Sequence, residues 1–122
     1  MIQYPDELSI EVDDHEYGPV LVVRGDVDAA TTPHLARSLE EALRARPHRL
    51  VVDLSETSHV DVSGVRALLE ARVAAGQDTL IAVVASGPAL QPLRESGLDS
   101  VMAVYPDLTM ALVCTAAAVE PL

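Results

Sequence analysis

The sequence lacks several residue types, and each absence narrows what the protein can do. It contains no Lys, so all eight basic residues are Arg, and chemistry that depends on a Schiff-base, phosphate-loop or general-base lysine is excluded. Phe and Trp are also absent and only three Tyr are present, so the core has to be packed from Val, Leu, Ile and Ala. Small aliphatic side chains suit close packing of helices on a sheet.

Cysteine and long apolar runs are scarce too. A lone Cys114 cannot form an internal disulfide, and its apolar surroundings predict a buried, inert thiol. No apolar run approaches the roughly 18 residues needed to cross a bilayer. The N-terminal residues Met1 to Glu7 are acidic where a signal peptide is basic. We therefore expect a cytoplasmic protein without direct membrane insertion.

Basic charge is in short supply, and this limits the partners. Nineteen acidic residues against eight basic ones give a net charge of −11, so phosphate backbones and anionic lipid surfaces repel the protein at long range. Nucleic-acid binding is not expected. A chain of 122 residues with 49% hydrophobic content can bury one core, so we expect a single domain over residues 1–122.

The order of apolar and turn-forming segments predicts an α/β fold. Alternation at Leu8 to Val12, the turn at Gly18-Pro19 and the run Val20 to Val23 predict an N-terminal antiparallel hairpin. Beyond it strands and helices alternate, which predicts a mixed β-sheet with parallel connections and about four helices. The helices are expected from Thr31 to Pro47, from Ser63 to Ala75, from Ser86 to Gly97 and from Pro106 toward Ala118.

Short continuous apolar runs predict the strands between these helices. The run from Leu50 to Leu54 is typical of a central strand that is covered on both faces. A polar loop is expected from Ser55 to Val62. Two further strands are expected at Thr79 to Ala85 and at Val101 to Val104.

The candidate functional stretch runs from His59 to Arg66, where a buried strand meets a helix N-terminus. Backbone N–H groups and the positive end of the helix dipole accommodate a phosphate on Ser63 without unfolding the helix. The added charge beside Asp61 would repel an acidic partner, and Arg66, one turn along, could pair with the phosphate. Asp and Ser are also ordinary helix caps, and close packing alone could explain Gly64, so this short motif does not decide the function by itself.

Three motifs in one order resemble the STAS domain of bacterial anti-sigma factor antagonists. That family typically shows a Gly-Glu-Leu-Asp turn, an apolar strand ending in Asp-Leu-Ser, and a Phe-x-Asp-Ser-Ser-Gly-Leu segment. The counterparts here are Gly25-Asp26-Val27-Asp28, Leu50-Val51-Val52-Asp53-Leu54-Ser55 and Asp61-Val62-Ser63-Gly64-Val65. The strand from Leu80 to Val84 and the helix end from Leu93 to Leu98 extend the resemblance over nearly the whole chain.

The resemblance implies a STAS fold and a role in transcription regulation by partner switching. The unphosphorylated protein would bind an anti-sigma factor, often itself a serine kinase, and so free a sigma factor. Phosphorylation of Ser63, the counterpart of the family's phosphorylated serine, would end that binding, and a phosphatase would restore it. The kinase supplies ATP and magnesium, so the chain is expected to need no cofactor or metal and to be no enzyme. A monomer or weak dimer is expected.

The resemblance also places partner-binding residues around Ser63. Asp28, Thr31 and Asp61 are expected to surround it at one edge, and the helix start is expected to complete the contact surface. The full expected set is Asp28, Thr31, Asp61, Val62, Gly64, Val65 and Arg66. Turn, cap and helix-face roles are the alternatives for these residues, and for Thr31 helix capping alone is sufficient.

Two residues depart from the family pattern. His59 stands where the family has Phe, and Val62 replaces the first serine of the pair. The Val62 departure keeps an alternative open, a STAS interaction subunit of a lipid-transport complex or stress-signalling assembly that phosphorylation does not switch. A receiver domain would need a lysine near its end, and a serine hydrolase would need a Gly-x-Ser-x-Gly elbow; the chain has neither.

Overall fold

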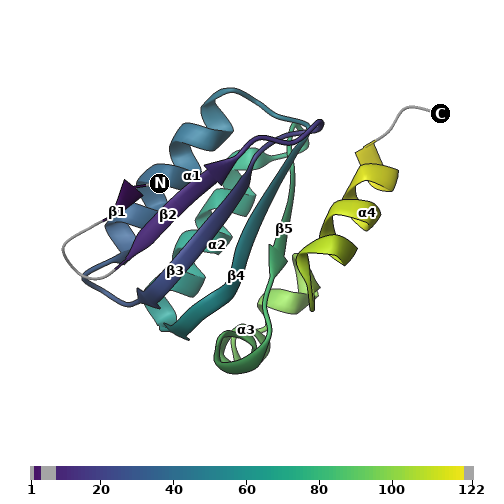
Figure 1. Cartoon of the computed structure of the whole chain (residues 1–122). Helices are drawn as coiled ribbons and strands as arrows, with labels where there is room; N and C mark the ends of the chain where they lie inside the picture. Colours follow the sequence, from purple (N-terminus) through teal and green to yellow (C-terminus); the bar gives the residue numbers. More distant parts are fainter. Residues whose placement is uncertain (1, 4–7, 120–122) are drawn as a thin grey trace.

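A computed structural model describes residues 2–3 and 8–119, so residues 4–7 of the acidic N-terminal segment and both ends of the expected domain lie outside it. Figure 1 shows a mixed β-sheet flanked by helices. The described strands follow one another in the sheet in sequence order: β1 (Ile2–Gln3), β2 (Ser9–Asp13), β3 (Val20–Val27), β4 (Arg49–Val60), β5 (Leu80–Val84) and β6 (Ala103–Tyr105). The described α-helices are α1 (Thr32–Arg44), α2 (Val62–Ala75), α3 (Leu90–Glu95) and α4 (Leu108–Val119).

The strand pairing confirms the expected hairpin and parallel connections. β2 pairs antiparallel with β1 and with β3, and the β2–β3 register runs from Asp13 opposite Val20 to Ser9 opposite Arg24. β3, β4, β5 and β6 are parallel neighbours. β4 therefore lies in the middle of the parallel part of the sheet, as its continuous apolar run predicted.

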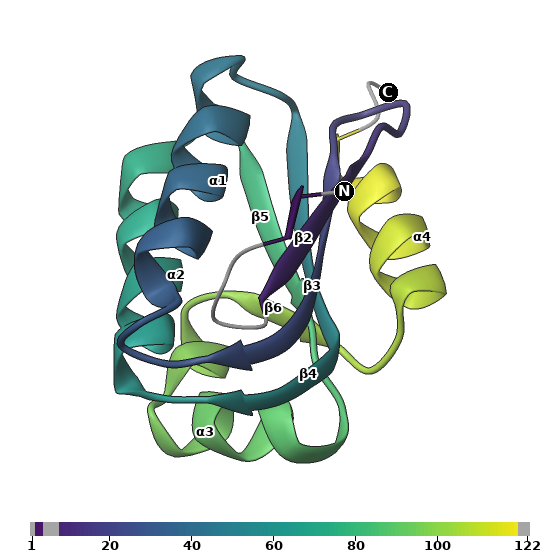
Figure 2. The same ribbon diagram turned by 60° about the vertical axis from the view of Figure 1, so that its left-hand side comes forward.

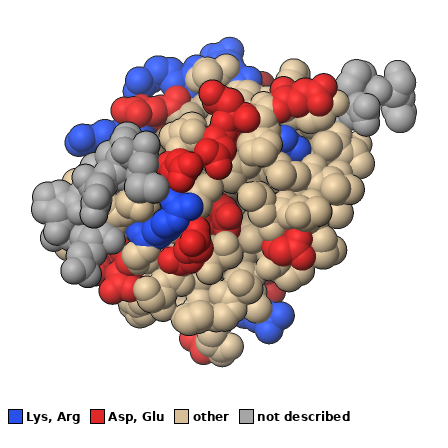
Figure 3. Space-filling model, in the orientation of Figure 1, with Lys and Arg blue, Asp and Glu red and all other residues tan. Residues whose placement is uncertain are grey.

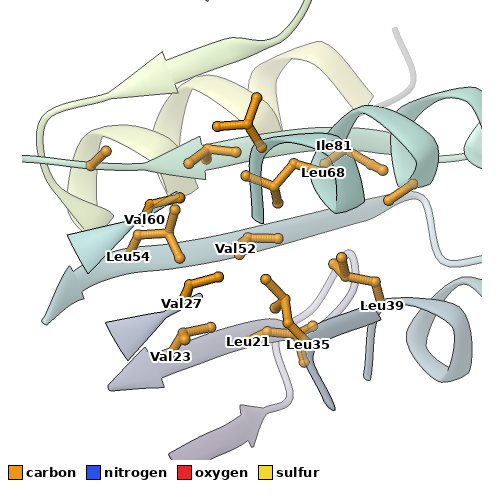
Figure 4. Close-up of a cluster of buried hydrophobic side chains, with 14 of the residues drawn as sticks. Leu21, Val23, Val27, Leu35, Leu39, Val52, Leu54, Val60, Leu68 and Ile81 are labelled. Atoms are coloured by element: carbon orange, nitrogen blue, oxygen red, sulfur yellow. The ribbon is translucent and has the colours of Figure 1, made fainter. Parts of the chain in front are cut away.

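The larger core lies between the sheet and the helix pair α1 and α2. Figure 2 shows these two helices on one face of the sheet and α4 on the other. Leu35 of α1 and Leu68 of α2 are 1% exposed and pack with Leu21 and Val52 of the strands beneath them (Figure 4). Every buried hydrophobic residue that the structure describes is aliphatic apart from Met102, which confirms the prediction drawn from the missing aromatics.

The second face of the sheet is covered by α4, and here the prediction for the cysteine was wrong. Ala111 and Thr115 are the buried residues of α4, whereas Cys114 is exposed. The described residues of α4 include no charged side chain, so its sequence does not reveal which side faces the sheet. The buried Arg49 of β4 fixes that side, because its Nη1 donates to the Leu112 carbonyl at 3.1 Å and to Thr115 Oγ1 at 3.2 Å.

The loop expected from Ser55 to Val62 was also wrong, because β4 continues as a strand through Val60. β3 runs on beside it to Val27, and the pairing crosses two irregularities before Val27 meets Val60. Thr57 contributes by donating its hydroxyl to the Val23 carbonyl at 3.1 Å. The polar side chains of this stretch therefore belong to a strand whose pairing is set by a neighbour far away in sequence. The last strand likewise begins at Ala103 instead of Val101.

Candidate functional site

The ends of β3 and β4 bring the starts of α1 and α2 to one end of the sheet. Val27 and Val60 are register partners at the last positions of their strands, and the Asp61 N–H donates to the Val27 carbonyl at 2.9 Å. Parallel strands end at the same edge of a sheet, so the helices that follow them begin close together. Figure 2 shows α1 and α2 side by side.

Asp61 is the N-cap of α2 and organises the helix start. Its Oδ1 accepts hydrogen bonds from the N–H groups of Ser63 at 3.0 Å and Gly64 at 3.3 Å, and also from the Ser63 hydroxyl. The hydrogen bond from the Ser63 hydroxyl is the largest of the effects that hold the pKa of Asp61 below its usual value. Burial raises this pKa, whereas the two backbone hydrogen bonds and the electrostatic effect of His59 lower it further. Asp61 is therefore an anion at neutral pH, and it can only accept hydrogen bonds.

The Ser63 hydroxyl lies in the first turn of α2 and is half-buried, not packed inside. Its Oγ contacts Asp61 Oδ1 and, at 3.0 Å, the Oγ1 of Thr32 in α1. The side chain is thus held between two helix N-termini, where the backbone N–H groups favour negative charge. The predicted neighbourhood of Ser63 and Asp61 is present in the structure.

Gly64 and Val65 face inward, although both were expected in the contact surface. A Cβ on Gly64 would lie 2.6 Å from Val27 Cγ1 and 3.1 Å from Val60 Cγ1, so this position allows α2 to approach the ends of β3 and β4. Val65 is 6% exposed and belongs to the main core. The structure therefore gives both residues a packing role, and neither presents more than a trace of surface.

Asp28 and Thr31 build the turn before α1, and no hydrogen bond joins either of them to Ser63 in the described part of the chain. Asp28 Oδ1 accepts from the N–H groups of Ala30 at 2.9 Å and Thr31 at 3.0 Å. The Thr31 hydroxyl is buried; it donates to the Asp26 carbonyl at 2.8 Å and accepts from the Asp28 N–H at 2.9 Å. Thr31 holds the N-cap position of α1, but its side chain does not make the expected capping bond.

Thr32 is the residue that the sequence did not single out. Thr31 and Thr32 are adjacent threonines before Pro33, and the pattern predicts a helix start without indicating which hydroxyl points where. Thr31 turns into the loop, whereas Thr32 points across to Ser63. Only the parallel packing of α1 and α2 brings positions 31 residues apart into this contact.

The outward side of the site is formed by Val62, His59 and Arg66. The Val62 side chain is 76% exposed, which is unusual for an aliphatic residue at a helix start. His59 is exposed on β4 and so does not replace the packing of a phenylalanine. The Arg66 side chain is exposed and makes no hydrogen bond or ion pair with another residue in the described part of the chain. The pairing of Arg66 with a phosphate on Ser63 stays a prediction.

A shallow groove opens beside the site between the start of α2 and α3. The end of β4 and the first turn of α2 form one wall, and α3 forms the other. Its lining consists of Val60, Asp61, Val62, Val65, Pro92, Glu95 and Ser96. The groove places an apolar surface directly next to the polar cluster around Ser63.

Comparison with known proteins identifies the family. The family model described as "Mlab, STAS domain" matches residues 10–108. The chain belongs to the STAS domain family. The anti-sigma-F factor antagonist RsfB of Mycobacterium tuberculosis is 30% identical over 109 residues, which cover 88% of this chain and 89% of that protein. Both the expected family and the expected fold are confirmed.

Solved structures of STAS proteins have the same fold. An anti-sigma factor antagonist from Mycobacterium paratuberculosis matches with a TM-score of 0.86 and 32% identity, covering 98% of this chain and all of that one. The antagonist SpoIIAA in its unphosphorylated form matches with a TM-score of 0.61 over 89% of this STAS chain and 98% of its own. At 13% identity the second likeness concerns the fold alone.

The described residues also bear on whether the chain could bind a charged ligand, a membrane or a metal ion. Acidic side chains outnumber basic ones on the face shown in Figure 3. On β3, Arg24 is engaged by Glu11 at 3.0 Å and Glu56 at 2.8 Å. In the described part of the chain no helix is long and apolar enough to span a membrane. Within the same residues no three His, Cys, Asp or Glu side chains are grouped so that they could hold a metal ion.

Proposed function

We propose that this chain is a bacterial cytoplasmic anti-sigma factor antagonist that binds an anti-sigma factor through the surface around Ser63 and is released when Ser63 is phosphorylated. The observation that carries the proposal is the half-buried Ser63 hydroxyl at the start of α2, beside the exposed Val62. Two similar proteins bear the name of anti-sigma factor antagonists, and their likeness extends over most of this chain.

The unphosphorylated surface offers a partner both apolar and basic contacts. Burying the exposed Val62 side chain in a complex contributes about 1.5 kcal/mol before the costs of association are subtracted. Arg66 has no acidic partner within the described chain and can pair with a carboxylate of the anti-sigma factor. The groove between α2 and α3 extends the apolar part of this surface.

Phosphorylation changes this surface at its centre. A phosphate on Ser63 adds about −1.5 to −2 charges next to Val62 and next to the anionic Asp61. A partner carboxylate that pairs with Arg66 would then face this charge, and the apolar contact at Val62 would have to form beside a strongly hydrated group. Repulsion and desolvation both weaken binding, while the fold keeps its helix cap.

The phosphoryl transfer itself needs ATP and magnesium from the kinase. The Ser63 oxygen forms a bond to the γ-phosphorus of ATP, the bond from that phosphorus to the β–γ bridging oxygen breaks, and ADP leaves with the electron pair. The Ser63 hydroxyl donates to Asp61 Oδ1 before the transfer, and its proton is released to water as the new bond forms. A phosphatase reverses the modification by hydrolysis. This chain acts by binding, with no cofactor of its own.

The experiment combines binding and labelling. A candidate anti-sigma factor kinase from the same genome is titrated with the full chain in a calorimeter, and the same pair is then incubated with magnesium and labelled ATP. We expect binding of the unmodified chain and incorporation of label, with at least about tenfold weaker binding after phosphorylation, equivalent to 1.4 kcal/mol. Ser63→Ala should bind but take up no label.

Ser58→Ala is the matched control, because Ser58 is an exposed hydroxyl on β4 only five positions away. This variant should be labelled like the wild type. Label that persists in Ser63→Ala would refute Ser63 as the acceptor, and equal affinity of both forms would refute the switch. Binding to a lipid-transport or stress-signalling subunit without any labelling would support the alternative STAS role.

A further inference from the structure

The two hydrogen bonds of the Ser63 hydroxyl have a defined direction. Asp61 is ionised and can only accept, so the Ser63 proton is donated to Asp61 Oδ1. With that proton committed, the 3.0 Å contact between Ser63 Oγ and Thr32 Oγ1 requires Thr32 to be the donor. The result is a relay in which Thr32 donates to Ser63 and Ser63 donates to Asp61.

Phosphorylation removes the hydrogen bond from Ser63 to Asp61 and leaves Thr32 able to donate. Once Ser63 has lost its proton, its oxygen and the Asp61 carboxylate face each other without a hydrogen between them, and the phosphate adds further negative charge. The phosphate must therefore turn away from Asp61. Thr32 lies on the other contact of the same oxygen and still has its hydroxyl proton to donate.

We propose that Thr32 is a positioning residue of the Ser63 site, orienting the serine before phosphoryl transfer and donating a hydrogen bond to the phosphate afterwards. The proposal rests on the proposed function, because it concerns the same modified serine. Among the described residues, Thr32 is the one side chain with a donor hydrogen placed against Ser63 Oγ. It also brings the phosphate to the N-terminus of α1 in addition to that of α2, and both ends favour negative charge.

The test uses the full chain with phosphoserine incorporated at position 63 by genetic code expansion, so it needs no kinase. Phosphorus NMR measures the second pKa of the phosphate in this chain and in its Thr32→Val variant, which has the same shape without the hydroxyl. A hydrogen bond favours the dianion, so its loss should raise this pKa by about half a unit or more. Thr32→Ser should restore the original value.

Thr109→Val is the matched control, since Thr109 is exposed in the first turn of α4 and should not affect the titration. The ionisable neighbours Asp61 and His59 and the exposed Arg66 are the same in every variant, so their effects cancel in the comparison. A second measurement requires no substitution: a proton–phosphorus correlation across the hydrogen bond should connect the phosphate to the Thr32 hydroxyl.

An unchanged pKa in a folded Thr32→Val variant would overturn the proposal, as would an equal shift in Thr109→Val. If Thr32→Val does not fold, the correlation decides, and its absence overturns the proposal. Failure of the proposed function is a separate result. A chain that its kinase does not label would refute the switch, whereas the phosphorus titration of the installed phosphoserine would still report on Thr32.

Discussion

The replacement of Gly64 by Ala tests whether close packing sets the position of the site. The added Cβ would lie 2.6 Å from Val27 Cγ1 and 3.1 Å from Val60 Cγ1. Both valines are buried, at 0% and 2% exposure, and a β-branched side chain has little rotamer freedom with which to move aside. We therefore expect the helix start, and Ser63 with it, to be pushed away from the ends of β3 and β4.

Two opposing effects set the magnitude. Alanine is better than glycine inside a helix by about 1 kcal/mol, so an open site would gain that amount. Overpacking in a well-filled core costs about 1–3 kcal/mol, and a contact of 2.6 Å with a buried valine places Gly64 at the upper end of that range. The expected net change is a loss of about 2 kcal/mol in the free energy of unfolding.

Urea unfolding followed by circular dichroism measures this loss, and Val27→Ala provides the decisive comparison. Val27→Ala removes the methyl group that the new Cβ would meet, so in that background Gly64→Ala should be neutral or stabilising. Gly76→Ala is the matched control. Gly76 has a φ of +55° and open space around it, so the cost of replacing it should be the same in the wild-type chain and in the Val27→Ala background.

Equal costs of Gly64→Ala in both backgrounds would refute the reasoning, because the steric contact with Val27 would then have no energetic consequence. A stabilised Gly64→Ala single variant would refute it as well.

Two further predictions concern single residues. Asp61→Ala should lower the free energy of unfolding by about 1 kcal/mol at pH 7 through loss of the helix cap. Because the pKa of Asp61 is lowered in the folded chain, its contribution to the free energy of unfolding is present above the ordinary aspartate pKa and is lost as the pH falls through the folded pKa. Thermal unfolding curves of the variant and the wild type should therefore converge in acid. A constant gap between them would contradict this. Cys114 should react with a thiol reagent in the folded chain as fast as in urea, and reaction only after unfolding would show that it is buried.

Local sequence patterns predicted the helices and strands whose bounds depend on residues nearby in the sequence. The boundaries of α2 follow from Asp61 as a cap, the apolar spacing from Val65 onward and Gly76 as the stop, and the structure has them at Val62–Ala75. The hairpin of β2 and β3 follows from alternation and a Gly-Pro turn. The ordered motifs around Gly25, Asp53 and Ser63 were sufficient to indicate the STAS family.

Features that depend on distant neighbours were predicted wrongly or not at all. The stretch from Ser55 to Val60 is polar, and it is a strand only because β3 extends alongside it. Cys114 lies in an apolar helix whose buried side is chosen by contacts with Arg49. The local spacing of residues indicates neither the strand at Ser55 to Val60 nor the buried side of α4.

The sequence by itself determined the fold family and placed a serine hydroxyl at a helix start next to an aspartate, because capping and periodicity act over a few residues. The tertiary structure decided what surrounds that hydroxyl. It pointed Thr32 at Ser63 and buried Gly64 against Val27. Those contacts join residues far apart in the sequence, and they exist because two parallel strands end together and start their helices side by side.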